Sequence, residues 1–259
     1  MVPRVAFEQS GVGEPWVLLH SFPLDRRMWA SQTAALVASG RQVVTVDLPG
    51  FGGSESDPSA APSLDRYAEA VLALLDEVGI AAATVLGLSL GGYVALRIAA
   101  IAPHRLRSLV LADTRAAADA PETRAGRVLN LGLVRSRGAS ALVDKLLPHL
   151  VAPGASARVR DNVRAWGAVQ STEALTYALL AMRDRADASE ALASLRCPVL
   201  FIVGAEDGIT PPASHHAMAS TVPGARVEVL AGAGHLSNLE APEAFNAALL
   251  RWANGLPLP

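Results

Sequence analysis

The chain has 259 residues, of which 51% are hydrophobic and 18% are charged, a composition that supports a large core and excludes an intrinsically disordered chain. Its formal net charge of -2 provides no general field for nucleic acid or for an anionic membrane surface, so we expect neither partner. Because we find no N-terminal targeting pattern and no apolar stretch of roughly 18 to 20 residues, we expect a cytoplasmic protein without a membrane span.

Short apolar runs alternate along the chain with longer segments of helical periodicity. This alternation predicts an α/β fold, with a mostly parallel twisted sheet covered by helices on both faces. Several of the predicted strands are apolar on successive residues, as expected when both faces of a strand are buried. In chain order we expect strands at 4–8 and 16–20, a helix at 28–39, a strand at 42–47, a helix at 64–79, a strand at 84–88, a helix at 90–101, strands at 106–112 and 199–204, a helix at 212–219, a strand at 226–230 and a helix at 242–253.

Residues 114–194 interrupt the alternation, because they carry helical periodicity and no strand signal. Segments 122–134, 139–150 and 172–183 have the pattern of amphipathic helices and are separated by prolines and a glycine. We therefore expect a helical cap over residues 114–194. The core domain would then consist of residues 1–113 and 195–259.

A candidate nucleophile lies in the pentapeptide Gly87-Leu88-Ser89-Leu90-Gly91, which follows a predicted strand and opens a predicted helix. A turn between strand and helix can hold Ser89 in a strained, left-handed backbone conformation with its hydroxyl projecting above the sheet edge. Larger side chains at Gly87 and Gly91 would collide across so sharp a turn. A phosphate-binding loop would require a different spacing of glycines, so we interpret Ser89 as a catalytic nucleophile.

A serine hydroxyl needs a neighbouring imidazole to accept its proton, and His235 is the best candidate. It follows the last predicted strand within a glycine-containing loop, where a ring can approach the carboxyl end of the sheet. Apart from His20 and His235, the histidines show no metal-ligand spacing, so we expect neither a metal nor another cofactor. We interpret these residues as solvated surface histidines: His104, His149, His215 and His216.

The third member of a catalytic triad accepts a hydrogen bond from the far ring nitrogen of the histidine. Asp207 is favoured because it follows a buried strand and gives the chain order Ser89, Asp207, His235. Asp113 also follows a predicted strand and could reach the same histidine. Glu206 is adjacent to Asp207 and is the third alternative.

With these residues, the whole chain resembles the α/β-hydrolase fold superfamily. Leu18-Leu19-His20-Ser21-Phe22-Pro23 is similar to the His-Gly-x-Pro loop of that family, and segment 47–54 is similar to its Asp-x-x-Gly-x-Gly-x-Ser loop. The resemblance implies an oxyanion hole made by the backbone N–H groups of Phe22 and Leu90. Ser21 stands where the family usually has glycine, so a backbone angle reserved for glycine would be strained there.

The segments 22–25, 28–29 and 111–115 look most like a smaller group of enzymes within that superfamily. This group contains 3-oxoadipate enol-lactonases, carboxylesterases and cofactor-free haloperoxidase-like perhydrolases. The resemblance implies hydrolysis of a small carboxylic ester or lactone through an acyl-enzyme on Ser89, with enol-lactonase and perhydrolase activities as alternatives. Enzymes with a carboxylate nucleophile are excluded by the serine, whereas a carbon–carbon bond hydrolase, a hydroxynitrile lyase and a non-catalytic ligand-binding protein stay open.

The expected partner is a small-molecule ester or lactone, and a homo-oligomer is compatible with the sequence. We predict that the substrate pocket is lined by four segments. They are the loop after the strand at 16–20, the turn that contains Ser89, the loop that contains His235 and the cap. These predicted substrate-binding residues are Phe22, Trp29, Leu90, Leu236, Trp166 and Met182.

Overall fold

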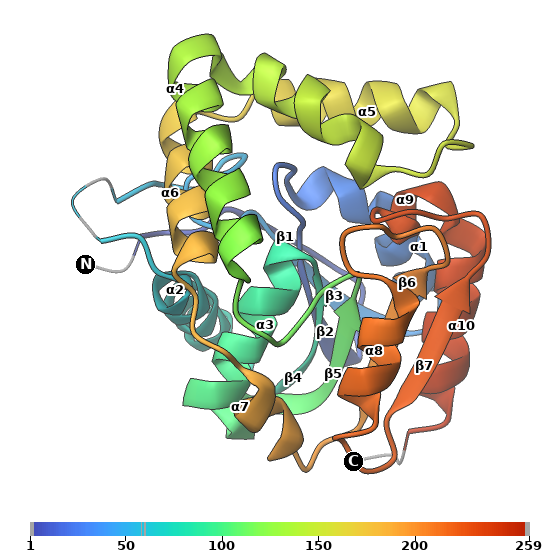
Figure 1. Cartoon of the computed structure of the whole chain (residues 1–259). Coiled ribbons are helices and arrows are strands. Elements are labelled where there is room, and N and C mark those ends of the chain that lie inside the picture. Colours follow the sequence, from blue (N-terminus) through green and yellow to red (C-terminus); the bar gives the residue numbers. More distant parts are fainter. Residues whose placement is uncertain (1–2, 58, 60, 257–259) are drawn as a thin grey trace.

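The computed structural model describes residues 3–57, 59 and 61–256 (Figure 1). Within these residues, a seven-stranded sheet has the order β1-β3-β2-β4-β5-β6-β7. β1 pairs antiparallel with β3, and each other pairing is parallel, which confirms the predicted mostly parallel sheet. The strands are β1 (Phe7–Ser10), β2 (Glu14–Leu19), β3 (Arg41–Val46), β4 (Ala83–Leu88), β5 (Leu106–Ala112), β6 (Val199–Gly204) and β7 (Arg226–Leu230).

Helices cover both faces of the sheet, as predicted. On one face lie α1 and α10, and on the other lie α2, α3 and α8. The core helices are α1 (Ala30–Ala38), α2 (Leu64–Glu77), α3 (Leu90–Ile101), α8 (Pro212–Ala219), α9 (Ser237–Glu240) and α10 (Pro242–Asn254), with 3₁₀ turns η1 (Arg26–Trp29) and η2 (Pro103–Arg105).

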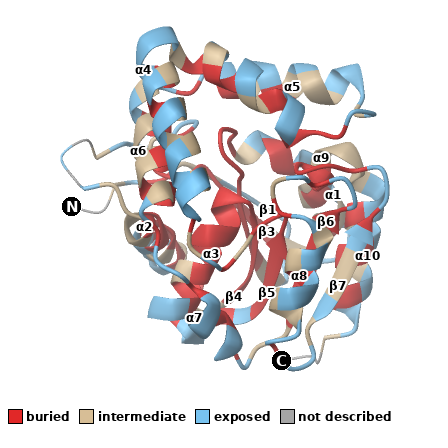
Figure 2. Cartoon of the chain, in the orientation of Figure 1, coloured by how far each residue is buried: buried red, intermediate tan, exposed pale blue. Residues whose placement is uncertain are grey.

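Alternate residues of each central strand pack into different halves of the core. In β2, Trp16 and Leu18 pack with the α1 and α10 side, whereas Val17 and Leu19 pack with the α2 and α3 side. All four side chains are buried, and Figure 2 shows the sheet buried at the centre of the molecule. A fully buried aliphatic side chain contributes about 1.5–3 kcal/mol, so this two-sided burial explains why the strands are continuously apolar.

Two predicted elements near the N-terminus differ from the structure. The first strand begins at Phe7, later than predicted, because its pairing with β3 runs from Phe7 opposite Val46 to Ser10 opposite Val43. The helix predicted at 28–39 is a 3₁₀ turn followed by α1. Asp25 caps that turn by accepting a hydrogen bond from the Arg27 N–H at 3.1 Å, which starts the turn earlier than the hydrophobic pattern indicates.

The insertion between β5 and β6 is helical, as predicted, and Figure 1 shows α4 and α5 on the side of the sheet toward which β5 and β6 point. The two helices predicted at 122–134 and 139–150 form the two arms of α4, which are separated at Gly138, whose φ of 76° and ψ of -177° are not helical. α5 was not predicted because only Val163 and Gly167 are buried on it, too few for an apolar stripe. The inserted helices are α4 (Pro121–Leu150), α5 (Ala157–Ala168), α6 (Thr172–Arg183) and α7 (Ser189–Ala193).

The exact limits of the cap, residues 114 and 194, stay a prediction. Although α4 is long, no helix in the described part of the chain combines the length and apolarity needed to cross a bilayer.

The prediction that His215 lies on the surface is wrong. His215 is fully buried in α8, and its ring packs against Phe201 at 6.3 Å. Its Nε2 accepts a hydrogen bond from the Thr114 N–H at 3.2 Å, and its Nδ1–H faces the Pro211 carbonyl at 3.4 Å. Burial lowers the pKa of His215 to about 4, so the ring is neutral at pH 7. The adjacent His216 is exposed, as predicted, because successive helical residues point in different directions.

We expect the neutral form of His215 to make stability dependent on pH. As the pH falls from about 6.5, the unfolded chain binds this proton before the folded chain does, so the stability contribution is lost progressively toward pH 4. Urea unfolding at pH 7 and pH 4 should show that wild type loses ~3 kcal/mol more than His215→Gln, whose side chain keeps an acceptor without a titrating ring. Equal losses in the two proteins would contradict this assignment.

Candidate active site

Ser89 forms the sharp turn between β4 and α3. Its backbone has φ 53° and ψ -109°, which agrees with the predicted positive φ and is costly for a residue other than glycine. A Cβ at Gly87 would collide with the Gly91 carbonyl, and a Cβ at Gly91 would collide with the Leu19 carbonyl. The glycines on both sides therefore allow the turn that directs the Ser89 hydroxyl toward His235 at the carboxyl end of the sheet.

The structure brings Ser89, His235 and Asp207 together. Ser89 Oγ lies 2.9 Å from His235 Nε2, and His235 Nδ1 lies 2.9 Å from Asp207 Oδ2. These residues follow β4, β7 and β6, whose carboxyl ends share one edge of the parallel sheet. Asp207 accepts the hydrogen bond from Nδ1–H, so Nε2 is free to accept the hydrogen bond from the serine hydroxyl.

Asp207 is held as a carboxylate by a tight turn. Its Oδ1 accepts hydrogen bonds from the N–H groups of Ile209 and Thr210 at 2.8 and 2.9 Å, and its Oδ2 also accepts from Thr210 Oγ1 at 2.5 Å. Burial alone would raise the pKa of Asp207, but attraction to His235 and the hydrogen bonds from His235 and Thr210 hold that pKa well below its ordinary value. Asp207 is therefore ionised throughout the neutral range.

The two alternative acids have different surroundings. Glu206 is exposed to solvent. Asp113 is fully buried, but its Oδ1 accepts from the Gly204 N–H at 2.9 Å and its Oδ2 accepts from the Ser237 hydroxyl. Burial raises the pKa of Asp113 well above its ordinary value, and the nearby Asp207 raises it further. Of these three acids, only Asp207 has a hydrogen bond to His235 in the structure.

The predicted strain at Ser21 is wrong. Among the described residues other than glycine, Ser89 and Asp113 alone have a positive φ, so Ser21 occupies an ordinary backbone conformation. The Ser21 N–H lies 3.2 Å from Met28 Sδ, and its hydroxyl donates to the Phe22 carbonyl at 3.1 Å. Serine thus fits this loop without the glycine-only angle.

A buried histidine fixes the same loop. His20 Nδ1–H donates to the Ser21 carbonyl at 3.0 Å, and Nε2 accepts from the Leu48 N–H at 2.9 Å. Burial lowers the pKa of His20, which favours the neutral ring that can act as donor and acceptor at once. The loop after β2, which contains Phe22, is thereby tied to the loop after β3. Leu90 is the first residue of α3, where the backbone N–H has no acceptor within the helix.

The predicted substrate walls occupy different environments. Trp29 and Leu236 are fully buried, and Trp29 packs against Phe245 at 6.4 Å, as expected of core residues. Met182 is buried in α6, whereas Trp166 is half-buried and lines a cavity of about 460 Å³ between α5, the segment of η1 and α1, and α9. Contact of any of these side chains with substrate stays a prediction.

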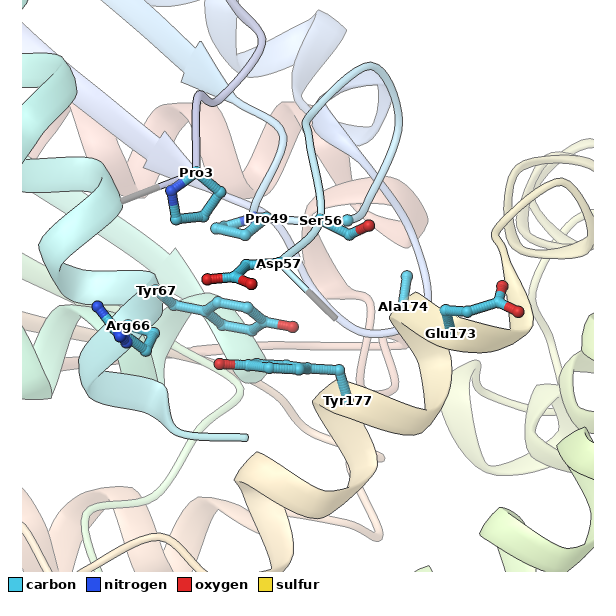
Figure 3. A pocket seen from close by; sticks show the side chains of 10 residues that line it. Pro3, Pro49, Ser56, Asp57, Arg66, Tyr67, Glu173, Ala174 and Tyr177 are labelled. Carbon is cyan, nitrogen blue, oxygen red and sulfur yellow. The ribbon is translucent and has the colours of Figure 1, made fainter. Parts of the chain in front are cut away.

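A second pocket lies between α2 and the inserted helix α6 (Figure 3). The rings of Tyr67 and Tyr177 stack there with their centroids 5.5 Å apart. The Tyr177 hydroxyl donates to the Ala61 carbonyl at 3.2 Å. Burial raises the pKa of Tyr67 well above its ordinary value, so its hydroxyl keeps its proton. None of Ser89, Asp207 and His235 lines this pocket, so we interpret the tyrosine pair as a contact that holds the inserted helix α6 on α2.

Two polar residues that join the cap to the site loops were missed from the sequence. Gln170 Nε2 donates to Asp25 Oδ2 at 2.9 Å, and Gln170 Oε1 accepts from the Gly52 N–H at 3.0 Å. Glu240 accepts hydrogen bonds from the backbone on both sides of His235. An acid five residues after the candidate histidine was the signal available for Glu240, whereas Gln170 has no local signal.

Over the part of the chain that is described, no group of three or more histidine, cysteine, aspartate or glutamate side chains is arranged to hold a metal ion.

Curated relatives match almost the whole chain. One is the dihydrolipoyllysine-residue acetyltransferase component of the acetoin cleaving system of Pseudomonas putida, 36% identical over 94% of this chain. The chain spans only 65% of that protein's length. Another is the pimeloyl-[acyl-carrier protein] methyl ester esterase of Neisseria meningitidis serogroup C, 36% identical over 90% of this chain and 91% of the relative.

Solved structures agree over the same extent. A thermophilic esterase from Thermogutta terrifontis has a TM-score of 0.92 and 35% identity, covering 96% of this chain and 93% of the other. The enol-lactonase from Burkholderia xenovorans LB400 has a TM-score of 0.86 and 28% identity, covering 97% of both chains. The sequence model of the Alpha/beta hydrolase family matches residues 16–248. The chain therefore belongs to the alpha/beta hydrolase family, and within it resembles esterases and enol-lactonases.

Proposed function

We propose that this protein is a serine hydrolase that cleaves a small carboxylic ester or lactone through an acyl-enzyme on Ser89. The observation that carries the proposal is the continuous path from Ser89 Oγ through the His235 ring to Asp207, with both contacts at 2.9 Å. The relatives named as esterases and as an enol-lactonase support the same class of substrate.

In the first half of the reaction, His235 Nε2 takes the proton of the Ser89 hydroxyl as Oγ attacks the carbonyl carbon of the ester. Asp207 stabilises the imidazolium that forms. The backbone N–H groups of Leu90 and Phe22 stabilise the negative oxygen of the tetrahedral intermediate, and loss of one such donor typically costs ~3 kcal/mol of transition-state stabilisation. The intermediate collapses when Nε2–H protonates the leaving oxygen, which leaves an acyl group on Oγ.

In the second half, water attacks the acyl-enzyme while His235 accepts its proton, and the acid product leaves with Ser89 restored. Peroxide in place of water would give a peracid, so perhydrolysis is the alternative that this same site supports. Ser89 is 9% exposed, Asp207 2% and His235 1%, so the reacting groups lie in a site with little access for bulk water.

The substrate pocket in this proposal lies between the core and a cap of residues 114–194. Phe22 and Leu236 lie in loops next to Ser89, and Leu90 is the first residue of α3. Trp166 and Met182 belong to the cap helices α5 and α6. Their mostly apolar side chains favour a small apolar acyl group. We also propose that the protein acts in the cytoplasm.

We expect Ser89→Ala to abolish hydrolysis of p-nitrophenyl acetate and covalent labelling by a fluorophosphonate probe, because both need the Oγ nucleophile. Initial rates and intact mass spectrometry measure the two effects, with wild type as the positive control. Hydrolysis retained by Ser89→Ala would refute the acyl-enzyme. A folded wild type that neither hydrolyses short esters nor labels, but binds an apolar ligand, would indicate the non-catalytic alternative.

The matched variants Asp207→Asn and Asp113→Asn test which acid serves His235. Asp207→Asn removes the charge and favours the wrong ring tautomer, so kcat should fall by ~10⁴-fold. Asn at position 113 can still accept from the Gly204 N–H and bond the Ser237 hydroxyl, so kcat should stay within a few-fold of wild type. Steady-state rates on p-nitrophenyl acetate, with melting temperatures as a check of folding, measure both. The opposite ranking would assign the acid to Asp113.

A further inference from the structure

Glu240, the last residue of α9, has a carboxylate bonded only to backbone N–H groups. Its Oε1 accepts from Gly234 at 3.0 Å and from Leu236 at 3.2 Å, the residues on either side of His235. Its Oε2 accepts from Ala152 at 2.7 Å, in the segment that follows α4. We call residues 234–236, which contain His235, the histidine loop. The Glu240 side chain therefore joins the histidine loop to the inserted helices.

The histidine loop also touches the segment after α4 directly. The Leu236 N–H is shared, because it donates to the Leu150 carbonyl at 3.0 Å as well as to Glu240. A Cβ at Gly234 would lie 2.5 Å from the Ala152 nitrogen, so the two backbones are as close as glycine permits. The position of the loop thus depends on where residues 150–152 lie.

Residues 150–152 are in turn held by the inserted helices. Leu150 is the last residue of α4, and its side chain is buried in the core. Arg160 in α5 donates through Nη2 to the Ala152 carbonyl at 2.9 Å and to the Pro153 carbonyl at 2.8 Å. A rigid path therefore runs from α4 and α5 through Ala152 and Glu240 to the peptides that flank His235.

We propose that Glu240 is a positioning residue that sets the place of the His235 ring and makes it depend on the seating of the inserted helices. This inference rests on the proposed function, because it concerns the Ser89–His235 contact. Burial raises the pKa of Glu240, and the hydrogen bonds from the N–H groups of Ala152, Gly234 and Leu236 oppose that rise. Because Glu240 Oε1 accepts from the N–H groups on both sides of His235, it holds both peptides in one arrangement. Displacement of a reacting group by 1 Å can cost ~100-fold in rate, which makes such a support visible in kcat.

Two substitutions distinguish the contacts of Glu240 with the peptides next to His235 from its contact with Ala152. Glu240→Ala removes all three acceptor contacts. Glu240→Gln can keep its amide oxygen toward Gly234 and Leu236, but its NH₂ group then faces the Ala152 N–H, so only the tie to the inserted helices is lost.

Kinetics on p-nitrophenyl acetate, corrected for the folded fraction from near-UV circular dichroism, measure the effect of each substitution. We expect kcat to fall by ~100-fold in Glu240→Ala and by ~10-fold in Glu240→Gln, with KM changed less than about twofold. The rate of fluorophosphonate labelling at Ser89 should fall by the same factors as kcat/KM, because both reactions use His235 as base.

Two control variants separate positioning from stability. Glu243→Gln changes an exposed acid three residues further on and should keep wild-type kinetics. Leu249→Ala removes a buried side chain of α10 and should lower the melting temperature while kcat per folded molecule stays near wild type. The proposal is overturned if folded Glu240 variants keep the kcat of wild type, or lose no more than Leu249→Ala does.

If Glu240→Ala fails to fold, Glu240→Gln alone decides, and a wild-type kcat in it overturns the proposal. The failure of this inference is distinguishable from failure of the proposed function. In the first case wild type labels at Ser89 and the Glu240 variants label equally fast, whereas in the second case wild type itself does not label.

Discussion

The strained backbone of Ser89 is the constraint on which the site depends. A non-glycine residue in so sparsely populated a conformation costs about 1–3 kcal/mol, so the surrounding structure must hold it. The Ser89 N–H donates to the Ala112 carbonyl at 3.0 Å, and the Ser89 carbonyl accepts from the Tyr93 N–H at 3.0 Å and from Thr114 Oγ1 at 2.9 Å. Residues at and after the end of β5 therefore hold the Ser89 turn together with α3. The buried His215 in turn holds Thr114, whose N–H donates to its ring.

The other reacting groups reach Ser89 because parallel strands end at one edge of the sheet. The strands bring the loops within reach, and hydrogen bonds inside and between the loops set their final positions. Thr210 shapes the Asp207 turn, His20 ties the loop of Phe22 to Leu48, and Glu240 ties the His235 loop to Ala152. Each of these bonds joins one side chain to a backbone N–H group, so a single polar residue sets the position of each loop.

Strands and sharp turns leave a local pattern in the sequence, whereas hydrogen bonds between distant loops do not, and this difference decides what could be predicted. β5 and β6 have the predicted limits because each is a mostly apolar run between breakers, whereas in β7 the apolar residues alternate with Arg226 and Glu228. The Ser89 turn can be predicted because it requires glycines at fixed positions. α5 was missed because few of its residues face the core, and the surroundings of His215 were wrong because α8 has no clear apolar stripe. Glu240 and Ala152 lie 88 residues apart, and a bond from a side chain to a distant backbone group leaves no pattern in either segment.

The contrast between Asp207 and Asp113 shows how one sheet edge produces two different carboxyl groups. Both follow parallel strands and both are buried, so the sequence left the choice between them open. Asp207 accepts from two N–H groups, a hydroxyl and His235, and these donors hold its pKa low despite burial. Asp113 accepts from only the Gly204 N–H and the Ser237 hydroxyl, and its pKa is raised by burial and by the charge of Asp207. The raised pKa of Asp113 disfavours a second carboxylate charge next to Asp207, so Asp207 is the acid that the proposed mechanism pairs with the His235 ring.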